Sequence, residues 1–237
     1  MISRESSSRS GLSWRSYSDK QLKKHRELRR QRPDRREEEH LFSKGYRRVA
    51  GIDEAGRGAL AGPVVAACVI LQPNASFSWL GHVHDSKLIR AKNREDLFAM
   101  MLGSGVEIGI GVIPPGVIDS VNILNATRQA MKMALEDLNE PPDYVLTDAV
   151  YLPGLRTGQR NIIKGDRTCL CIACASIAAK VTRDRIMLDL HAEYPRYSFN
   201  KHKGYGTGEH MQSLLVHGAC EIHRRSFRPV RELLRLL

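Results

Sequence analysis

Apolar residues recur along the chain at two different spacings, and this pattern predicts a mixed α/β protein. Runs of branched apolar residues bounded by Gly and Pro are typical of strands. Such runs predict strands at residues 46–53, 64–71, 107–113, 144–147 and 162–163. Apolar residues at helical spacing predict helices at residues 92–102, 118–138, 168–191, 208–217 and 229–236. This order predicts an α/β fold in which helices flank a mixed β-sheet whose first three strands form an antiparallel meander.

The first forty residues have a different composition. Eight of the first 18 residues are Ser, and the basic stretch that follows has few apolar residues with which to bury a core face. We expect disorder over residues 1–19 and a frayed helix over residues 20–45, interrupted at Pro33. Residues 1–40 carry +5 of the chain's net charge of +11. They form either a basic arm that contacts nucleic acid or a solvated leader that is dispensable.

The overall composition excludes several classes of protein. A hydrophobic content of 42% in 237 residues is sufficient for a core. The longest apolar run, residues 59–71, is interrupted by Gly62 and Pro63 and is too short to cross a membrane. Residues 1–19 lack the apolar segment of a secretory signal. Five cysteines, an odd number, favour a reducing cytoplasm over a disulfide framework, and the positive charge favours a polyanionic partner such as nucleic acid.

Four carboxylates follow predicted apolar strands. Asp53 and Glu54 end the first strand, Asp148 ends the fourth, and Asp166 follows the fifth. Adjacent strand residues point to opposite faces, so Asp53 and Glu54 share a site only if the strand breaks at Ala55-Gly56. Converging carboxylates repel one another, and a divalent cation removes that repulsion. Oxygen-only ligands favour Mg²⁺ or Mn²⁺, and a pair of such ions supports phosphodiester hydrolysis.

The segment Gly56-Arg57-Gly58 has two interpretations. It is either a turn between strands that requires positive φ, or a loop whose backbone N–H groups and guanidinium approach a phosphate or hydroxyl. The segment matches neither a dinucleotide-binding fingerprint nor a P-loop.

Three cysteines near the start of the long predicted helix are interpreted as packing residues. Because Cys169, Cys171 and Cys174 lie on the predicted helix, the second and third side chains point about 200° and 140° away from the first, and the three thiols cannot share one ion. The stretch CLCIACASIAA is apolar on every side, which predicts a helix buried against the sheet. For Ser176, its one polar residue, the simplest role is hydrogen bonding to the helix backbone.

Taken together, the motifs of residues 41–230 resemble bacterial ribonuclease HII, a type 2 RNase H. The order and approximate spacing are those of this family. The motifs are GIDEAGRGALAGPVVAA from Gly51, DSK from Asp85, NILNAT from Asn122, KGD from Lys164, ASIAAKVTRD from Ala175, HKGY from His202 and HRRSF from His223.

The resemblance implies an RNase H-like fold with a small C-terminal helical extension. We divide the chain into a leader (1–40), a catalytic core (41–192) and an extension that contributes to substrate binding (193–237). The implied activity is Mg²⁺- or Mn²⁺-dependent cleavage of RNA in RNA–DNA hybrids and on the 5′ side of single ribonucleotides in duplex DNA. The implied products have 3′-OH and 5′-phosphate ends, and the implied roles are ribonucleotide excision repair and primer removal.

The resemblance also assigns the carboxylates. Asp53, Glu54 and Asp148 correspond to the principal catalytic metal ligands, and Asp166 completes a second metal site. Asp184 is a competing fourth acid, which we reject because Lys180 stands one helical turn away as a partner.

The remaining motifs supply substrate-binding residues. The loop Gly56-Arg57-Gly58 corresponds to the one that reads the 2′-hydroxyl, and its G-R-G sequence and the short leader favour the HII type over ribonuclease HIII. Tyr205 resembles a family tyrosine that stacks on deoxyribose; the alternative is that it is a half-buried core residue. Phosphate or substrate contacts are expected from Lys87, Ser176, Lys180 and Lys203; Ser86 alternatively caps the following segment.

Two other functions fit the sequence less well. A junction resolvase is disfavoured by the G-R-G and H-K-G-Y motifs, and a non-catalytic nucleic-acid-binding module is disfavoured by four carboxylates that would face a phosphate backbone. We expect a cytoplasmic monomer without membrane contact. The sequence does not reveal recruitment by replication or repair proteins.

Overall fold

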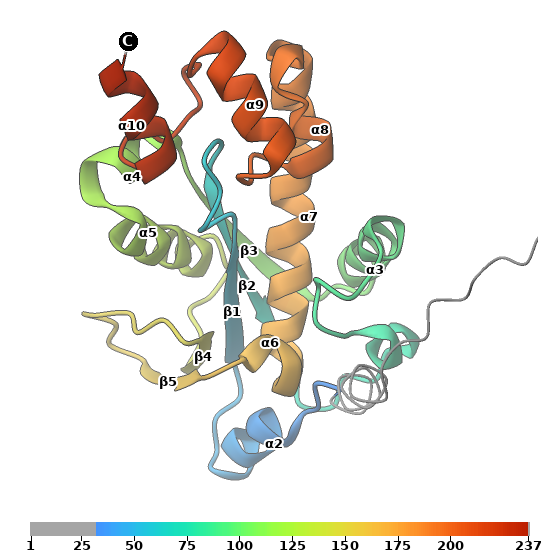
Figure 1. Ribbon diagram of the computed structural model, residues 1–237. Coiled ribbons are helices and arrows are strands. Elements are labelled where there is room, and N and C mark those ends of the chain that lie inside the picture. The colour runs from blue at the N-terminus through green and yellow to red at the C-terminus, as the bar shows by residue number, and fades with distance from the viewer. Residues whose placement is uncertain (1–31, 237) are drawn as a thin grey trace, which may run out of the picture. The chain divides into compact units, whose positions relative to one another are not determined.

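A five-stranded mixed sheet in the order β3-β2-β1-β4-β5 lies at the centre of the computed structural model, which describes residues 32–236 (Figure 1). Its strands are β1 (Val49–Ala55), β2 (Val64–Ile70), β3 (Glu107–Ile113), β4 (Tyr144–Asp148) and β5 (Gly158–Ile162). The first three strands pair antiparallel, whereas β4 pairs parallel with β1 and β5 parallel with β4. The predicted α/β class and meander are therefore confirmed. The predictions for residues 1–31 lie outside the described part of the chain.

Helices cover both faces of this sheet. Helix α7 (Leu170–Glu193) packs on β1 and β2, and α5 (Ile123–Glu136) packs on β2 and β3 from the other side (Figure 1). Gly51 of β1 allows α7 to lie close, because a Cβ at this position would collide with the backbone of Cys171. The side chain of Ile52, the next residue, belongs to the core on the α5 face.

Shorter helices complete the two layers. They are α2 (Arg36–Ser43), α3 (Ala91–Gly103), α4 (Pro115–Val121), α6 (Gly165–Thr168), α8 (Phe199–His202), α9 (Gly208–His217), α10 (Arg228–Leu236) and the 3₁₀ helices η1 (Ser78–His82) and η2 (Pro195–Tyr197). The predictions that correspond to α3, α9 and α10 are confirmed to within a residue or two. Over residues 32–236, no helix combines the length and the apolar character needed to cross a membrane.

Two elements differ from the sequence prediction. The single helix expected over residues 118–138 is two helices, α4 and α5, because Asn122 between them has a φ of +67° and its side chain accepts a hydrogen bond from the N–H of Asn125. Strand β5 extends the predicted strand at 162–163 back to Gly158. Its sequence, GQRNI, is polar because β5 is an edge strand with mostly solvated side chains.

The segment that precedes β1 packs on the core. Helix α2 buries Glu38 and Leu41, and the backbone of Asp34 exchanges hydrogen bonds with Thr168 and Leu170 at the start of α7. The boundary we predicted at residue 40 falls within α2, and the described part of the expected frayed helix is folded. The sequence does not predict this contact, because one of the two side chains that α2 buries, Glu38, is a carboxylate that is normally exposed.

The start of α7 also differs from the expectation. Cys169 has extended backbone angles (φ −116°, ψ 125°), and the helix begins at Leu170. The prediction that Cys169, Cys171 and Cys174 are buried is confirmed. The helical geometry assumed for Cys169 was wrong, however, and the Sγ atoms of Cys169 and Cys171 lie 3.5 Å apart.

The C-terminal helices have a small core of their own beside the last turns of α7. It consists of Leu60, Ala61, Met187, Tyr197, Phe199, Leu214 and Val230. Because two of these residues belong to the loop between β1 and β2, the extension rests directly on the G-R-G region.

Candidate active site

Three of the predicted acids are brought together by the sheet and the turn that follows β5. β1 and β4 run parallel and pair up to Ile52 and Thr147, so Asp53 and Asp148 are the next residues on neighbouring strands. Asp166 lies in α6, after a turn in which Lys164 has left-handed backbone angles. The N–H of Gly165 donates to Asp148 Oδ1 at 3.0 Å and holds α6 against the end of β4.

Glu54 joins this group without the strand break that we expected. β1 continues to Ala55, which pairs with Val65 of β2. The pairing of β1 with β4 ends at Ile52 and Thr147, so Glu54 lies beyond the paired part of β1 on that side. The Glu54 side chain is only 12% exposed, and Arg57 Nη1 lies 3.5 Å from its Oε1.

Burial and the repulsion between neighbouring carboxylates raise the pKa values of three of the four acids. Burial raises the pKa of Asp53 well above its ordinary value, and the charges of Glu54 and Asp148 raise it further. Burial and the charge of Asp148 likewise raise the pKa of Glu54, although Arg57 opposes the shift. The pKa of Asp148 is raised by burial and by Asp166, against the hydrogen bond from Gly165.

The donor atoms of the site fit a divalent metal ion. Asp53, Glu54, Asp148 and Asp166 offer only oxygen ligands, the set that Mg²⁺ or Mn²⁺ prefers. Glu54 Oε2 is buried and has no hydrogen-bond partner among residues 32–236. A hard cation would satisfy this atom and offset the repulsion that raises the pKa values.

The D-S-K segment supplies the cation nearest to these carboxylates. Lys87 Nζ lies 3.2 Å from Asp166 Oδ2 and remains 72% exposed. Ser86 is buried, and its hydroxyl is 2.9 Å from the hydroxyl of Ser176 on α7. The Ser176 hydroxyl opposes the rise in the pKa of Asp53 that burial causes. The two serines thus join the D-S-K segment to α7 beside the carboxylates.

The G-R-G loop is anchored by a buried arginine of α7. Gly56 has a φ of +89°, and the guanidinium of Arg183 occupies the space that a Cβ would need. Arg183 donates to the carbonyl oxygens of Ala61, Pro63 and Lys203 at 3.0, 2.9 and 2.9 Å. The interpretation of Gly56 as a positive-φ position is therefore correct.

A second buried arginine holds the same loop from the extension. Arg224 donates to the carbonyl oxygens of Arg57 and Gly62, both at 3.0 Å. The Arg57 side chain itself remains 46% exposed. Gly58 has no described atom within 4 Å of a Cβ position, so its surroundings are open. Sequence reasoning missed the roles of Arg183 and Arg224, because nothing in the sequence around either residue indicates that its side chain is buried.

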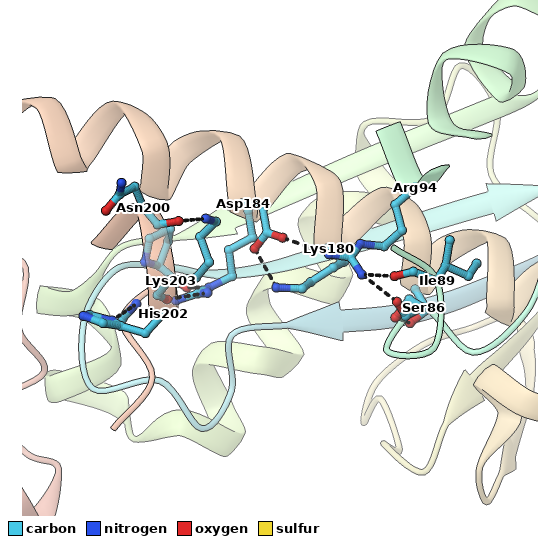
Figure 2. Close-up of polar contacts among 12 residues, drawn as sticks. Ser86, Ile89, Arg94, Lys180, Asp184, Asn200, His202 and Lys203 are labelled. Carbon is cyan, nitrogen blue, oxygen red and sulfur yellow. Dashed lines mark hydrogen bonds and ion pairs between the residues drawn. The ribbon is translucent and has the colours of Figure 1, made fainter. Parts of the chain in front are cut away.

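A second group of predicted residues lies further along α7. Lys180 Nζ is 2.6 Å from Asp184 Oδ1, so the ion pair on which we rejected Asp184 as a metal ligand is present. Figure 2 shows Asp184 between Lys180 and Arg94, which donates to the carbonyl oxygens of Ser86 and Ile89. Asp184 thus connects Lys180 to the D-S-K segment.

The H-K-G-Y loop lies against the same stretch of α7. The Tyr205 ring centre is 5.3 Å from Arg183 Cζ and 5.9 Å from Lys180 Nζ. Lys203 Nζ donates to the carbonyl oxygen of Asn200 (Figure 2), while its own carbonyl oxygen accepts a hydrogen bond from Arg183. The predicted residues thus form two adjoining groups, one around the carboxylates and one around Tyr205, joined by α7.

Comparison with known proteins agrees with this geometry. The family model described as Ribonuclease HII matches residues 50–230. Ribonuclease HII of Dehalococcoides mccartyi is 46% identical over 197 residues, which cover 83% of this chain and 93% of the relative. Ribonuclease HII of Geobacillus kaustophilus is 50% identical over 200 residues, covering 84% and 75% of the two chains.

Solved structures share the fold at lower identity. Ribonuclease H2 from Pyrococcus horikoshii has a TM-score of 0.67 and 23% identity, with 80% of this chain and 98% of that chain covered. RNase HIII from Bst, solved in complex with Mn²⁺, has a TM-score of 0.60 and 16% identity, with 81% and 70% covered. At these identities the two structures confirm the RNase H-like fold alone.

Proposed function

Because the chain belongs to the ribonuclease HII family and is a type 2 RNase H endonuclease of RNA–DNA hybrids, we propose that it also cuts duplex DNA at single embedded ribonucleotides. Cleavage falls on the 5′ side of the ribonucleotide and leaves 3′-OH and 5′-phosphate ends. The observation that carries the proposal is the group of four buried or half-buried carboxylates at the ends of β1 and β4 and in α6, with Arg57 beside it.

The carboxylates are proposed to hold Mg²⁺ or Mn²⁺. Asp53, Glu54 and Asp148 are the principal ligands, and Asp166 completes a second position. When bound, two such ions supply an activated water and stabilise the leaving oxygen of the phosphodiester. Lys87, held beside Asp166, offsets part of the remaining charge and faces solvent, where a substrate phosphate can reach it.

The G-R-G loop is proposed to recognise the ribose. Its backbone is fixed from behind by Arg183 and Arg224, so the loop can present N–H groups in constant positions. Arg57 is half-exposed beside Glu54 and can donate to the 2′-hydroxyl or the adjacent phosphate. Open space at Gly58 allows the substrate backbone to approach closely.

The second group is proposed to bind the DNA that flanks the ribonucleotide. Tyr205 stacks on a deoxyribose, while Lys180 and Lys203 contact phosphates. Ser176 acts from beneath the carboxylates through its contacts with Ser86 and Asp53. Residues 193–237 thereby contribute to substrate binding, because Lys203 and Tyr205 belong to them.

The cellular role is proposed from the reaction. Cleavage next to an embedded ribonucleotide serves ribonucleotide excision repair and primer removal in the cytoplasm, and we propose that the enzyme acts as a monomer. A solved neighbour with a TM-score of 0.62 is the PCNA:RNase HII complex of Archaeoglobus fulgidus. Recruitment by a replication protein is therefore a proposal that a binding assay can address.

A nicking assay tests the proposed function. The full-length protein with Mg²⁺ or Mn²⁺ should nick a DNA duplex that contains one ribonucleotide, on its 5′ side. Arg57→Ala should lower this rate at least about tenfold, the value of one charge-assisted hydrogen bond. Arg36→Ala, an exposed arginine of α2, is the matched control and should cut like the wild type. The proposal is wrong if neither metal supports nicking, and the role of Arg57 is wrong if both variants behave alike.

A further inference from the structure

A second cluster of metal-binding side chains lies where α2 meets the start of α7. It consists of Glu38, Cys169 and Cys171, whose ligand atoms all lie within 4.8 Å of one another. All three residues are buried, with relative exposures of 0%. The cluster contains none of the four carboxylates of the candidate active site, and it contains sulfur, which that site lacks.

The local backbone creates this cluster. Cys169 is extended and Cys171 lies in the first turn of α7, so their Sγ atoms face each other at 3.5 Å. Two thiolates on a tetrahedral zinc ion with Zn–S bonds of about 2.3 Å lie about 3.8 Å apart. The observed separation therefore needs little adjustment to become one edge of such a site.

Glu38 is the unusual member of the cluster. Its Oε1 accepts the N–H of Cys171 at 2.8 Å, as expected for a carboxylate at a helix N-terminus. Its Oε2 is buried without a hydrogen-bond partner among residues 32–236. Capping of α7 explains the position of Oε1 but provides no partner for Oε2. A buried polar atom without a hydrogen bond carries a desolvation penalty, so native proteins rarely leave one unpaired. A cation between this carboxylate and the two thiols would remove that cost.

The surroundings can accommodate the charge of a filled site. Two thiolates, one carboxylate and a divalent cation sum to −1. The guanidinium of Arg35 acts on Glu38, and the positive end of the 24-residue helix α7 points at the cluster. Sulfur ligands favour Zn²⁺ and related soft ions over the Mg²⁺ that oxygen ligands favour.

We propose that Glu38, Cys169 and Cys171 form a binding site for a thiophilic divalent cation such as Zn²⁺, which fastens α2 to the start of α7. Binding converts the two S–H groups to thiolates and releases two protons to solvent, with no change of oxidation state. The second oxygen of Glu38 or a water fills the fourth position of the ion. The site is separate from the proposed nuclease function and links the segment before β1 to the longest helix of the core.

Cobalt spectroscopy tests the proposal. The full-length, reduced and metal-free protein is titrated with Co²⁺, and thiolate-to-cobalt absorption is recorded; carboxylate sites give no such band. The wild type should show a band that saturates at one Co²⁺ per chain and is abolished by one equivalent of Zn²⁺. Glu38→Gln should weaken binding at least about tenfold, and Cys169→Ser/Cys171→Ser should remove the band.

Cys220→Ser is the matched control, because the thiol of Cys220 lies 3.1 Å from His223 Nδ1 and could by itself contribute a thiolate-to-cobalt band. This variant should keep the band. A wild-type protein without a band, or one whose band is lost in Cys220→Ser and kept in the double variant, overturns the proposal. A loss of 2 Da without metal binding, which indicates a disulfide, overturns it as well. If the double variant does not fold, the presence of the band in wild type and in Cys220→Ser decides the outcome.

Discussion

Two buried polar clusters of this protein differ in how their polar atoms are satisfied. In the carboxylate cluster, Asp53, Glu54 and Asp148 each have a raised pKa because burial and like charges oppose ionisation. All the side-chain oxygens there are acceptors when ionised, and one of them has no partner within the described residues.

The histidine cluster of the C-terminal extension is balanced instead. The N–H of Cys220 donates to His223 Nδ1, so the ring proton of His223 is on Nε2, where it meets His210 Nε2 at 3.0 Å. The proton of His210 is then on Nδ1, which donates to the carbonyl of Tyr205 at 3.0 Å. His202 stacks on His210 and hydrogen bonds to Tyr197 and Gly204.

This difference distinguishes a structural cluster, the histidines, from a functional one, the carboxylates. A network in which every donor meets an acceptor rigidifies the fold and needs no ligand. A network with surplus negatively charged acceptors is stabilised by a partner that brings positive charge. The histidines therefore hold the Tyr205 loop, whereas the carboxylates are left for a metal ion and its substrate. Substitutions in the two clusters should accordingly have opposite effects on stability.

The largest effect is expected for Asp53→Asn. Cleavage should fall by at least about a hundredfold, the scale of a single electrostatic group in catalysis. The metal-free variant should melt at a higher temperature than the wild type, because a repelled charge is gone. This gain should grow as pH rises from the unfolded-state pKa of Asp53 through its raised folded-state pKa. Over that range, ionisation of Asp53 lowers the stability of the wild type, and the asparagine of the variant does not ionise. Asp189→Asn, at an exposed position of α7, is the control; a melting temperature of Asp53→Asn below that of the wild type would contradict the comparison.

Arg183→Met should lower the stability of the protein, in contrast to Asp53→Asn. Arg183 belongs to neither cluster, but its donors are paired with carbonyl oxygens, as the donors of the histidines are. The substitution removes the donor for three carbonyl groups, and the free energy of unfolding should fall by roughly 2–4 kcal/mol. Cleavage should fall as well, because the G-R-G loop loses its support. Urea unfolding and nicking rates measure the two effects, and Arg183→Lys should recover part of both. Arg185→Met, at an exposed position two residues further on, is the control. An unchanged free energy of unfolding in Arg183→Met would refute the supporting role.

The smallest effect is a pH dependence of the extension. Burial, together with the neighbouring histidines, lowers the pKa of His210 and of His223 to about 4. The unfolded chain binds these protons near pH 6.5, so stability is lost as pH falls from about 6.5 to about 4. In His223→Gln the loss of melting temperature between pH 7 and pH 5 should be smaller than in the wild type. His217→Gln, at an exposed position, should retain the full loss; equal losses in both variants would contradict the assignment.

Much of the fold was predictable from local pattern. The branched apolar runs of β1, β2 and β3 identify buried strands, and the helical spacing in α3, α5 and α9 survives in the structure. The failures were local as well. Asn122 ends a helix through a positive φ that its neighbours do not reveal, and β5 lacks an apolar pattern because it lies at the sheet edge.

The candidate site was predictable in its members but not in its support. The four carboxylates and the G-R-G segment stand in motifs that can be read along the chain. The contact of Gly56 with Arg183 joins positions far apart in sequence, and no local pattern marks this arginine as buried. The same is true of Glu38, whose partners Cys169 and Cys171 lie more than 130 residues away.

The sequence by itself determined the fold class, the family and the residues that carry the chemistry, because these depend on residue types and spacings along the chain. The tertiary structure alone decided which buried polar atoms are satisfied. It placed guanidinium groups behind the G-R-G loop, closed the histidine network, and left Glu54 Oε2 and Glu38 Oε2 without partners among the described residues. Whether a buried polar atom has a hydrogen-bond partner depends on contacts between residues far apart in sequence. A local sequence pattern does not specify these contacts.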